Sequence, residues 1–227
     1  MATATDNGTY DPLDMEVRTG GGGDFSTLDA DNYPATVVGI IHVGTQKYMK
    51  EKDGVKTQAE RPEVVLIYEI DEKQPDGTPF LMARQYNASM HDKATLYEIA
   101  ASLLGQKYEQ GQRVSIRSLL GAPCMCEVTL NPSKKDPSKS YNNLGKVARL
   151  GRGMAKPVPS TPLTIWTTVD GTPIPDLSWA PRIYGTTIET IIEESAEFRA
   201  GKVPRAAGAK TSHMTQAEAD EADDIPF

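Results

Sequence analysis

The stretch TLYEIAASLLG, residues 95–105, separates two groups of β-rich segments and therefore decides how the fold is interpreted. Its apolar side chains recur at helical spacing, at Leu96, Ile99, Ala100 and Leu103. This periodicity predicts an amphipathic helix. Thr95 with Glu98 fits a capping box at its start, and Gly105 suits the position just past its end. The sequence thus predicts one helix between the two groups of strands.

The segments on either side of this helix are typical of β-strands. Three precede it: ATVVGIIHV (35–43), EVVLIYEI (63–70) and FLMARQYNA (80–88). Two follow it: PCMCEVTLN (123–131) and YNNLGKVARL (141–150). They are rich in β-branched or alternating apolar residues. Three strands, a helix and two strands is the order of an OB-fold, a five-stranded, partly open barrel. We expect a mainly β protein with this barrel, a helix between strands 3 and 4, a C-terminal helix and disordered termini.

The composition along the chain predicts four parts. These are a flexible acidic leader (1–30), the OB-fold domain (31–155), a Pro-rich wrap with an amphipathic helix (156–205) and a disordered acidic tail (206–227). We expect the amphipathic helix to span residues 186–201, with Thr186 and Glu189 at its start and Gly201 at its end. A long polar segment, residues 45–62, is expected to connect the first two strands as a loop.

The charge of the chain is distributed unevenly. Residues 1–31 carry seven acids and one Arg, and residues 211–227 carry five acids and no Lys or Arg. Of the total of −7, these ends leave +4 for the residues between them. A basic body with acidic ends fits a nucleic-acid binder whose negative arms compete for a positive groove.

The composition argues against several other classes. The two cysteines, Cys124 and Cys126, are too close for an ordinary structural disulfide and are expected to point into the core from one face of a strand. The histidines lie singly at His42, His91 and His213. We therefore expect no metal site and no cofactor. No catalytic constellation is recognisable, so the chain is expected not to be an enzyme. No apolar run reaches membrane-spanning length, and the N-terminus lacks the charged and apolar blocks of a secretory signal, which suits a reducing cytoplasm.

Basic and aromatic residues gather where an OB-fold binds its ligand. Single-stranded DNA requires cations for its phosphates and flat rings on which bases stack. The alternative interpretation is that these lysines are solvated surface residues and these tyrosines are half-buried packing residues, and that neither binds a ligand. The candidate DNA-binding residues are Lys47, Tyr48, Lys50, Lys52, Lys56 and Arg61 between strands 1 and 2, Arg84 and Tyr86 on strand 3, Lys134, Lys135, Lys139 and Tyr141 between strands 4 and 5, and Arg149 and Arg152 beyond.

The last residues, EADDIPF (221–227), place an aromatic ring after a cluster of acids. Pro226 fixes its own φ and biases Ile225 toward extended backbone, which lowers the cost of ordering the tip on a partner. An acidic tail that only confers solubility is the alternative. The tip is the candidate partner-binding segment.

Two sets of residues carry a resemblance to known families. DDIPF (223–227) is similar to the acidic C-terminal tip of bacterial single-stranded DNA-binding proteins. The segments DNYPATVVGIIHVGTQ (31–46), HDKATLYEIAASLLG (91–105), LLGAPCMCEVTLN (119–131) and SYNNLGKVARLGRG (140–153) resemble phage-encoded OB-fold single-stranded DNA-binding proteins. Unlike the bacterial proteins, the chain lacks a long Gly/Gln-rich linker and a tryptophan-rich barrel.

The resemblance implies a phage protein of DNA replication, recombination and repair that coats single strands with little sequence preference in the host bacterial cytoplasm. It also implies recruitment of replication and repair proteins through Asp223, Asp224, Ile225, Pro226 and Phe227. Two alternatives stay open from the residues. One is an adaptor that uses the same tip but binds no DNA, and the other is a replication enzyme whose site carries no recognisable motif.

Overall fold

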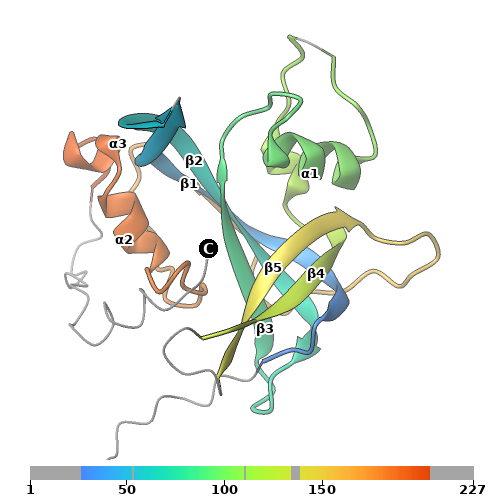
Figure 1. Ribbon diagram of the computed structural model, residues 1–227. Helices are drawn as coiled ribbons and strands as arrows, with labels where there is room; N and C mark the ends of the chain where they lie inside the picture. Colours follow the sequence, from blue (N-terminus) through green and yellow to red (C-terminus); the bar gives the residue numbers. More distant parts are fainter. Residues whose placement is uncertain (1–26, 53, 110, 134–138, 205–227) are drawn as a thin grey trace, which may run out of the picture.

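The computed structural model describes residues 27–52, 54–109, 111–133 and 139–204, except for the side chain of Lys52. This part is mainly β (Figure 1). The strands are β1 (Asp31–Lys52), β2 (Val55–Lys73), β3 (Pro79–Asn87), β4 (Pro123–Pro132), β5 (Ser140–Arg149) and β6 (Thr164–Thr167). The helices are α1 (Thr95–Leu104), the 3₁₀ helix η1 (Ile116–Leu119), α2 (Ile188–Glu193) and α3 (Ala196–Arg199). The predicted order of three strands, a helix and two strands is confirmed.

The strands β3, β2, β1, β4 and β5 neighbour one another in that order, all antiparallel, and β6 runs parallel beside β1. β3 and β5 stand at the two ends of this order, and no backbone ladder joins them in the described part of the chain. Arg84 of β3 spans the gap instead, since its Nη1 donates to the carbonyl oxygens of Leu144 (3.0 Å) and Gly145 (3.1 Å) of β5. A side chain thus links the strands that a closed barrel would pair.

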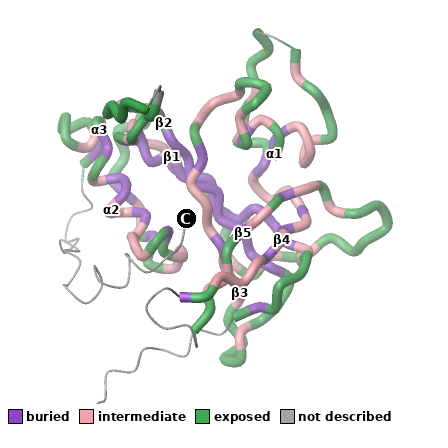
Figure 2. The backbone as a smooth tube through the Cα atoms, viewed as in Figure 1, coloured by how far each residue is buried: buried purple, intermediate pink, exposed green. Residues whose placement is uncertain are grey.

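The β1–β2–β3 sheet is buried on both faces. Along β2, Val64, Leu66 and Tyr68 belong to an inner core shared with β4, β5 and α1. Val65 and Ile67, which alternate with them, belong to an outer core. Opposite faces of one strand therefore meet different layers, which explains the unbroken apolar run in β2. Figure 2 shows this burial continuing from β1 and β2 into α2.

Residues 164–203, which we call the C-terminal cover, supply the side of the outer core that faces the sheet. It contains Trp166 of β6 and Leu177, together with Ile188, Ile191 and Ile192 of α2. The predicted core position of the cysteines is confirmed on the other side of the sheet, where neither Cys124 nor Cys126 has any exposed surface. Their Sγ atoms lie 3.9 Å apart, and both thiols are free.

The polar segment 45–62 is a β-ribbon, and the prediction of a loop is wrong. β1 and β2 stay paired from Gln46 opposite Arg61 to Lys52 opposite Val55. The hydrogen bonds of an antiparallel pair are made by backbone groups, so polar residues can continue a ladder. The apolar parts of β1 and β2 set the register, and the polar segment continues it. Apolar alternation is missing because most side chains of the ribbon meet water on both faces.

The helix ends differ partly from the prediction. Gly105 ends α1 with a left-handed φ of 68°, as expected, but Ala94 is the N-cap and no side chain caps the start, so the Thr95 capping box is wrong. α2 is capped by Thr187, which accepts from the Thr190 N–H, and not by Thr186. None of the helices in the described residues has the length and apolarity that crossing a membrane requires.

The predicted C-terminal helix is broken into α2 and α3 at Ser195. This buried residue has extended backbone, and its hydroxyl accepts from the Phe198 N–H to begin α3. The break brings Glu197 to β1, where the carboxylate accepts from the Thr45 N–H (2.7 Å) and hydroxyl (2.8 Å). The apolar periodicity of residues 186–201 thus continues past the point where α2 ends, and a contact with β1 accompanies the break.

Candidate nucleic-acid interface

The outer face of β2 and β3, where an OB-fold binds its ligands, is covered in this protein. Val65 and Ile67 of β2 and Leu81 and Ala83 of β3 pack against the outer core. At one end of this face, Glu69 is also enclosed, because Ser160 and Thr161 donate to its carboxylate. This covered part of the sheet is therefore not open to a ligand in the described structure.

Arg84 and Tyr86 share one face of β3, as predicted, but that face looks into the inner core. Tyr86 is 5% exposed, and its hydroxyl lies 3.3 Å from that of Tyr68. Burial raises the pKa of Tyr86 to about 12. The Arg84 guanidinium lies 5.6 Å from the centroid of the Tyr86 ring. The stacking of a base on Tyr86 is incompatible with this burial, and its ring serves the core.

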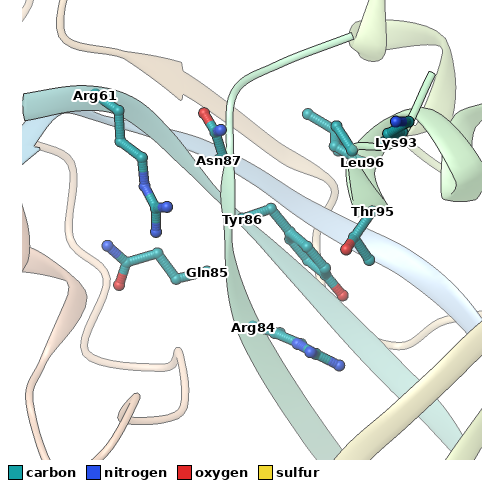
Figure 3. A pocket seen from close by; sticks show the side chains of 9 residues that line it. Arg61, Arg84, Gln85, Tyr86, Asn87, Lys93, Thr95 and Leu96 are labelled. Atoms are coloured by element: carbon teal, nitrogen blue, oxygen red, sulfur yellow. The ribbon is translucent and has the colours of Figure 1, made fainter. Parts of the chain in front are cut away.

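A hollow of about 290 Å³ lies at the free edge of β3, beside the start of α1. We call it the basic hollow. It is lined by Arg61, Arg84, Gln85, Tyr86, Asn87, Lys93, Ala94, Thr95 and Leu96. Figure 3 shows Arg61 and Gln85 on one side of β3, and Arg84 and Thr95 on the other. Three cations and no carboxylate line this space, so it suits an anion.

Arg61 is held in place by neighbours on three strands. Its guanidinium lies 4.3 Å from the centroid of the Tyr48 ring on β1. Its Nε donates to Glu63 Oε1 at 2.5 Å, and Gln85 of β3 donates to the other carboxylate oxygen. Glu63 is buried while Arg61 is partly exposed. The buried carboxylate thus orients a guanidinium whose remaining N–H groups suit a phosphate.

The structure separates the lysines of the β1–β2 ribbon from the end of β4 and the start of β5. The turn between β1 and β2 lies at the top left of Figure 1, whereas β4 ends and β5 begins at the bottom. Lys47, Lys50 and Lys56 are exposed on the ribbon. Lys139 is exposed beside β5, and Tyr141 is half-buried. The expected groove between these two regions is therefore not formed by the described residues.

Arg149 lies against the end of α1 and Arg152 is exposed in the turn that follows β5. A Cβ at Gly105 would come within 2.7 Å of Arg149 Nη1. A cation there suits the partial negative charge of a helix C-terminus, which gives Arg149 a structural role. Lys134, Lys135, the side chain of Lys52 and the tip Asp223–Phe227 lie outside the described residues.

Sequence reasoning missed four polar residues that line the basic hollow, namely Gln85, Asn87, Lys93 and Thr95, as well as Ala94 and Leu96. Lys93 stands just before a predicted helix and after a predicted strand, but only tertiary packing places it near Arg61. A signal for the ribbon was present in the sequence, since Asp-Gly, the pair at positions 53 and 54, favours two-residue hairpin turns. Comparison of the chain with protein-family models and with curated protein sequences finds no match. The candidate interface is therefore interpreted from its geometry.

Proposed function

We propose that this protein is a non-catalytic, phage-type single-stranded DNA-binding protein built on an OB barrel. The observation that carries the proposal is the group formed by Tyr48, Arg61 and the basic hollow. It combines a partly exposed ring, an oriented guanidinium and two further cations. Phosphate neutralisation and stacking on a ring are the two contacts by which proteins bind unpaired strands without reading their sequence.

The resemblance of the chain supports a role in phage replication, recombination and repair. In this proposal Asp223, Asp224, Ile225, Pro226 and Phe227 recruit host or phage replication proteins while the folded body holds DNA. The barrel would be an OB-fold whose usual ligand face is occupied by its own C-terminal cover. DNA would then bind at the edge of β3 and along the β1–β2 ribbon.

Binding of oligo(dT) is expected to fall steeply with salt. If Lys50, Arg61, Arg84 and Lys93 each neutralise one phosphate, the slope of log K against log salt is about −3. Raising the salt from about 50 to about 200 mM would then weaken binding about 50-fold. Fluorescence anisotropy of labelled oligo(dT) across a salt series measures this slope, and a duplex of equal length is the control.

Absence of binding to single strands at low salt would contradict the proposal and favour the adaptor that uses only the tip. Equal affinity for the duplex would contradict the preference for unpaired strands. Cleavage of DNA in the presence of Mg²⁺ would instead indicate a replication enzyme.

Deletion of residues 215–227 is expected to strengthen oligo(dT) binding severalfold at low salt and to have little effect at high salt. The deleted segment contains all five acids of the tail, and negative charge on the chain competes with DNA for a cationic surface. The same anisotropy titration measures the change. A control chain in which these acids are replaced by their amides should behave like the deletion, and unchanged or weaker binding by both would exclude competition by the tail.

A further inference from the structure

The β1–β2 ribbon has two chemically different faces. Cross-strand register places Gln46 opposite Arg61, Tyr48 opposite Ala59 and Lys50 opposite Thr57. Side chains of directly opposed residues point to the same face of a sheet. The described side chains of this face, which we call the cationic face, are Gln46, Tyr48, Lys50, Val55, Thr57, Ala59 and Arg61. None of them is a carboxylate.

The opposite face of the ribbon carries balanced charge. Lys47 lies opposite Glu60, and Lys56 lies opposite Glu51. Unlike charges that face each other across two strands offset one another's field. The three lysines Lys47, Lys50 and Lys56 are all exposed, yet only Lys50 has no acid as its cross-strand neighbour.

The cationic face begins where the C-terminal cover ends. Gln46 is 7% exposed because its amide donates to the carbonyl oxygens of Val43 (2.7 Å) and of Ile191 in α2 (2.9 Å). Two residues further along β1, Tyr48 is only half-buried, and Lys50 beyond it is exposed. The ribbon therefore extends past α2 with this face open.

Arg61 joins the cationic face to the basic hollow. It stands over Tyr48 on the ribbon and also lines the hollow with Arg84 and Lys93. From Thr57, the partner of Lys50, to Arg61 the strand advances about 14 Å. Positive charge is thus spaced along a path from the ribbon to the edge of β3, which complements the repeating charge of a phosphodiester backbone.

We infer that a single DNA strand lies along the cationic face of the ribbon, with its backbone continuing past Arg61 into the basic hollow, and does not contact the opposite face. This inference rests on the proposed function and adds to it the path of the strand. The ring of Tyr48 offers its exposed part to a base, while the cations Lys50, Arg61, Arg84 and Lys93 neutralise phosphates along the path.

The lysines of the ribbon provide a matched experiment in the full-length protein. Lys50→Gln and Lys93→Gln are each expected to weaken oligo(dT) binding about fivefold at about 0.1 M salt and to reduce the salt slope by about 0.7, as the loss of one phosphate contact predicts. Lys47→Gln and Lys56→Gln remove the same charge from the opposite face and should change affinity less than twofold. All four side chains are exposed, and thermal melting confirms that each variant is folded.

Equal losses in Lys47→Gln and Lys50→Gln, or no loss in Lys50→Gln, would overturn the one-faced path while leaving DNA binding intact. If Lys93→Gln keeps the full affinity for oligo(dT), the DNA strand does not enter the basic hollow. Failure of the unmodified protein to bind oligo(dT) would instead refute the proposed function itself. Poly-L-glutamate that competes as strongly as oligo(dT) of equal charge would identify the face as a site for an acidic protein and overturn its assignment to DNA.

Discussion

Replacing Ile192 with Asp is expected to destabilise the protein by more than about 4 kcal/mol. Ile192 of α2 has no exposed surface and packs in the outer core. Truncating such a side chain to Ala costs about 2 to 5 kcal/mol, and Asp adds the cost of an unpaired buried charge. Urea denaturation followed by tryptophan fluorescence measures the loss, because Trp166 belongs to the same core.

The matched control is Val169→Asp, because Val169 is 74% exposed just after β6. Its stability should change by no more than about 0.5 kcal/mol. A small effect of Ile192→Asp would mean that the C-terminal cover packs loosely and detaches without unfolding the sheet. In that case the outer face of β2 and β3 would be open to a ligand, and the proposed path of DNA along the ribbon would lose its main support.

Replacing Glu69 with Gln is expected to cost about 3 kcal/mol at neutral pH and almost nothing near pH 2. Burial disfavours the charged carboxylate, but hydrogen bonds from Ser160 (2.8 Å) and the Thr161 N–H (2.7 Å) outweigh it and lower the pKa of Glu69 to about 2. A carboxylate whose pKa is lower in the folded state stabilises it above the pKa of the unfolded chain. That stabilisation disappears as pH falls from about 5 to about 2.

Urea denaturation of both proteins at pH 7, 4 and 2.5 tests this expectation, and the two stability curves should converge as the pH falls. Glu72→Gln is the control, since Glu72 is an exposed carboxylate on the same strand. It should change stability at neutral pH by no more than about 0.5 kcal/mol. If the free energy of unfolding of Glu69→Gln differs from that of the unmodified protein by the same amount at all three pH values, ionisation of Glu69 is not what anchors residues 160 and 161.

The inner core was accessible to sequence reasoning because its signals are local. The period of Leu96, Ile99 and Ala100 predicted α1, and Gly105 ended it with the expected left-handed backbone. The two-residue spacing of Cys124 and Cys126 predicted that both point inward. Each of these inferences depends on residues within a few positions of one another.

The candidate interface was accessible only in part. Tyr48, Arg61, Arg84 and Tyr86 were identified as candidate cations and rings. The structure places the last three around the basic hollow, and Tyr48 contacts Arg61 from the ribbon. Their roles were not separable in the sequence, because Tyr86 and Tyr48 are both tyrosines on strands and only packing buries the first. No pattern in the sequence predicts that Lys93 lies near Arg61.

The sequence by itself determined the order of the strands and α1 and the inward face of β4, because side-chain periodicity and turn residues act over a few positions. Tertiary structure alone decided that residues 164–203 cover the outer face of the sheet, that the polar segment between the first strands is a paired ribbon, and that the described side chains on one face of this ribbon include no carboxylate. These outcomes depend on contacts and cross-strand register between residues far apart in the chain, where periodicity carries no information.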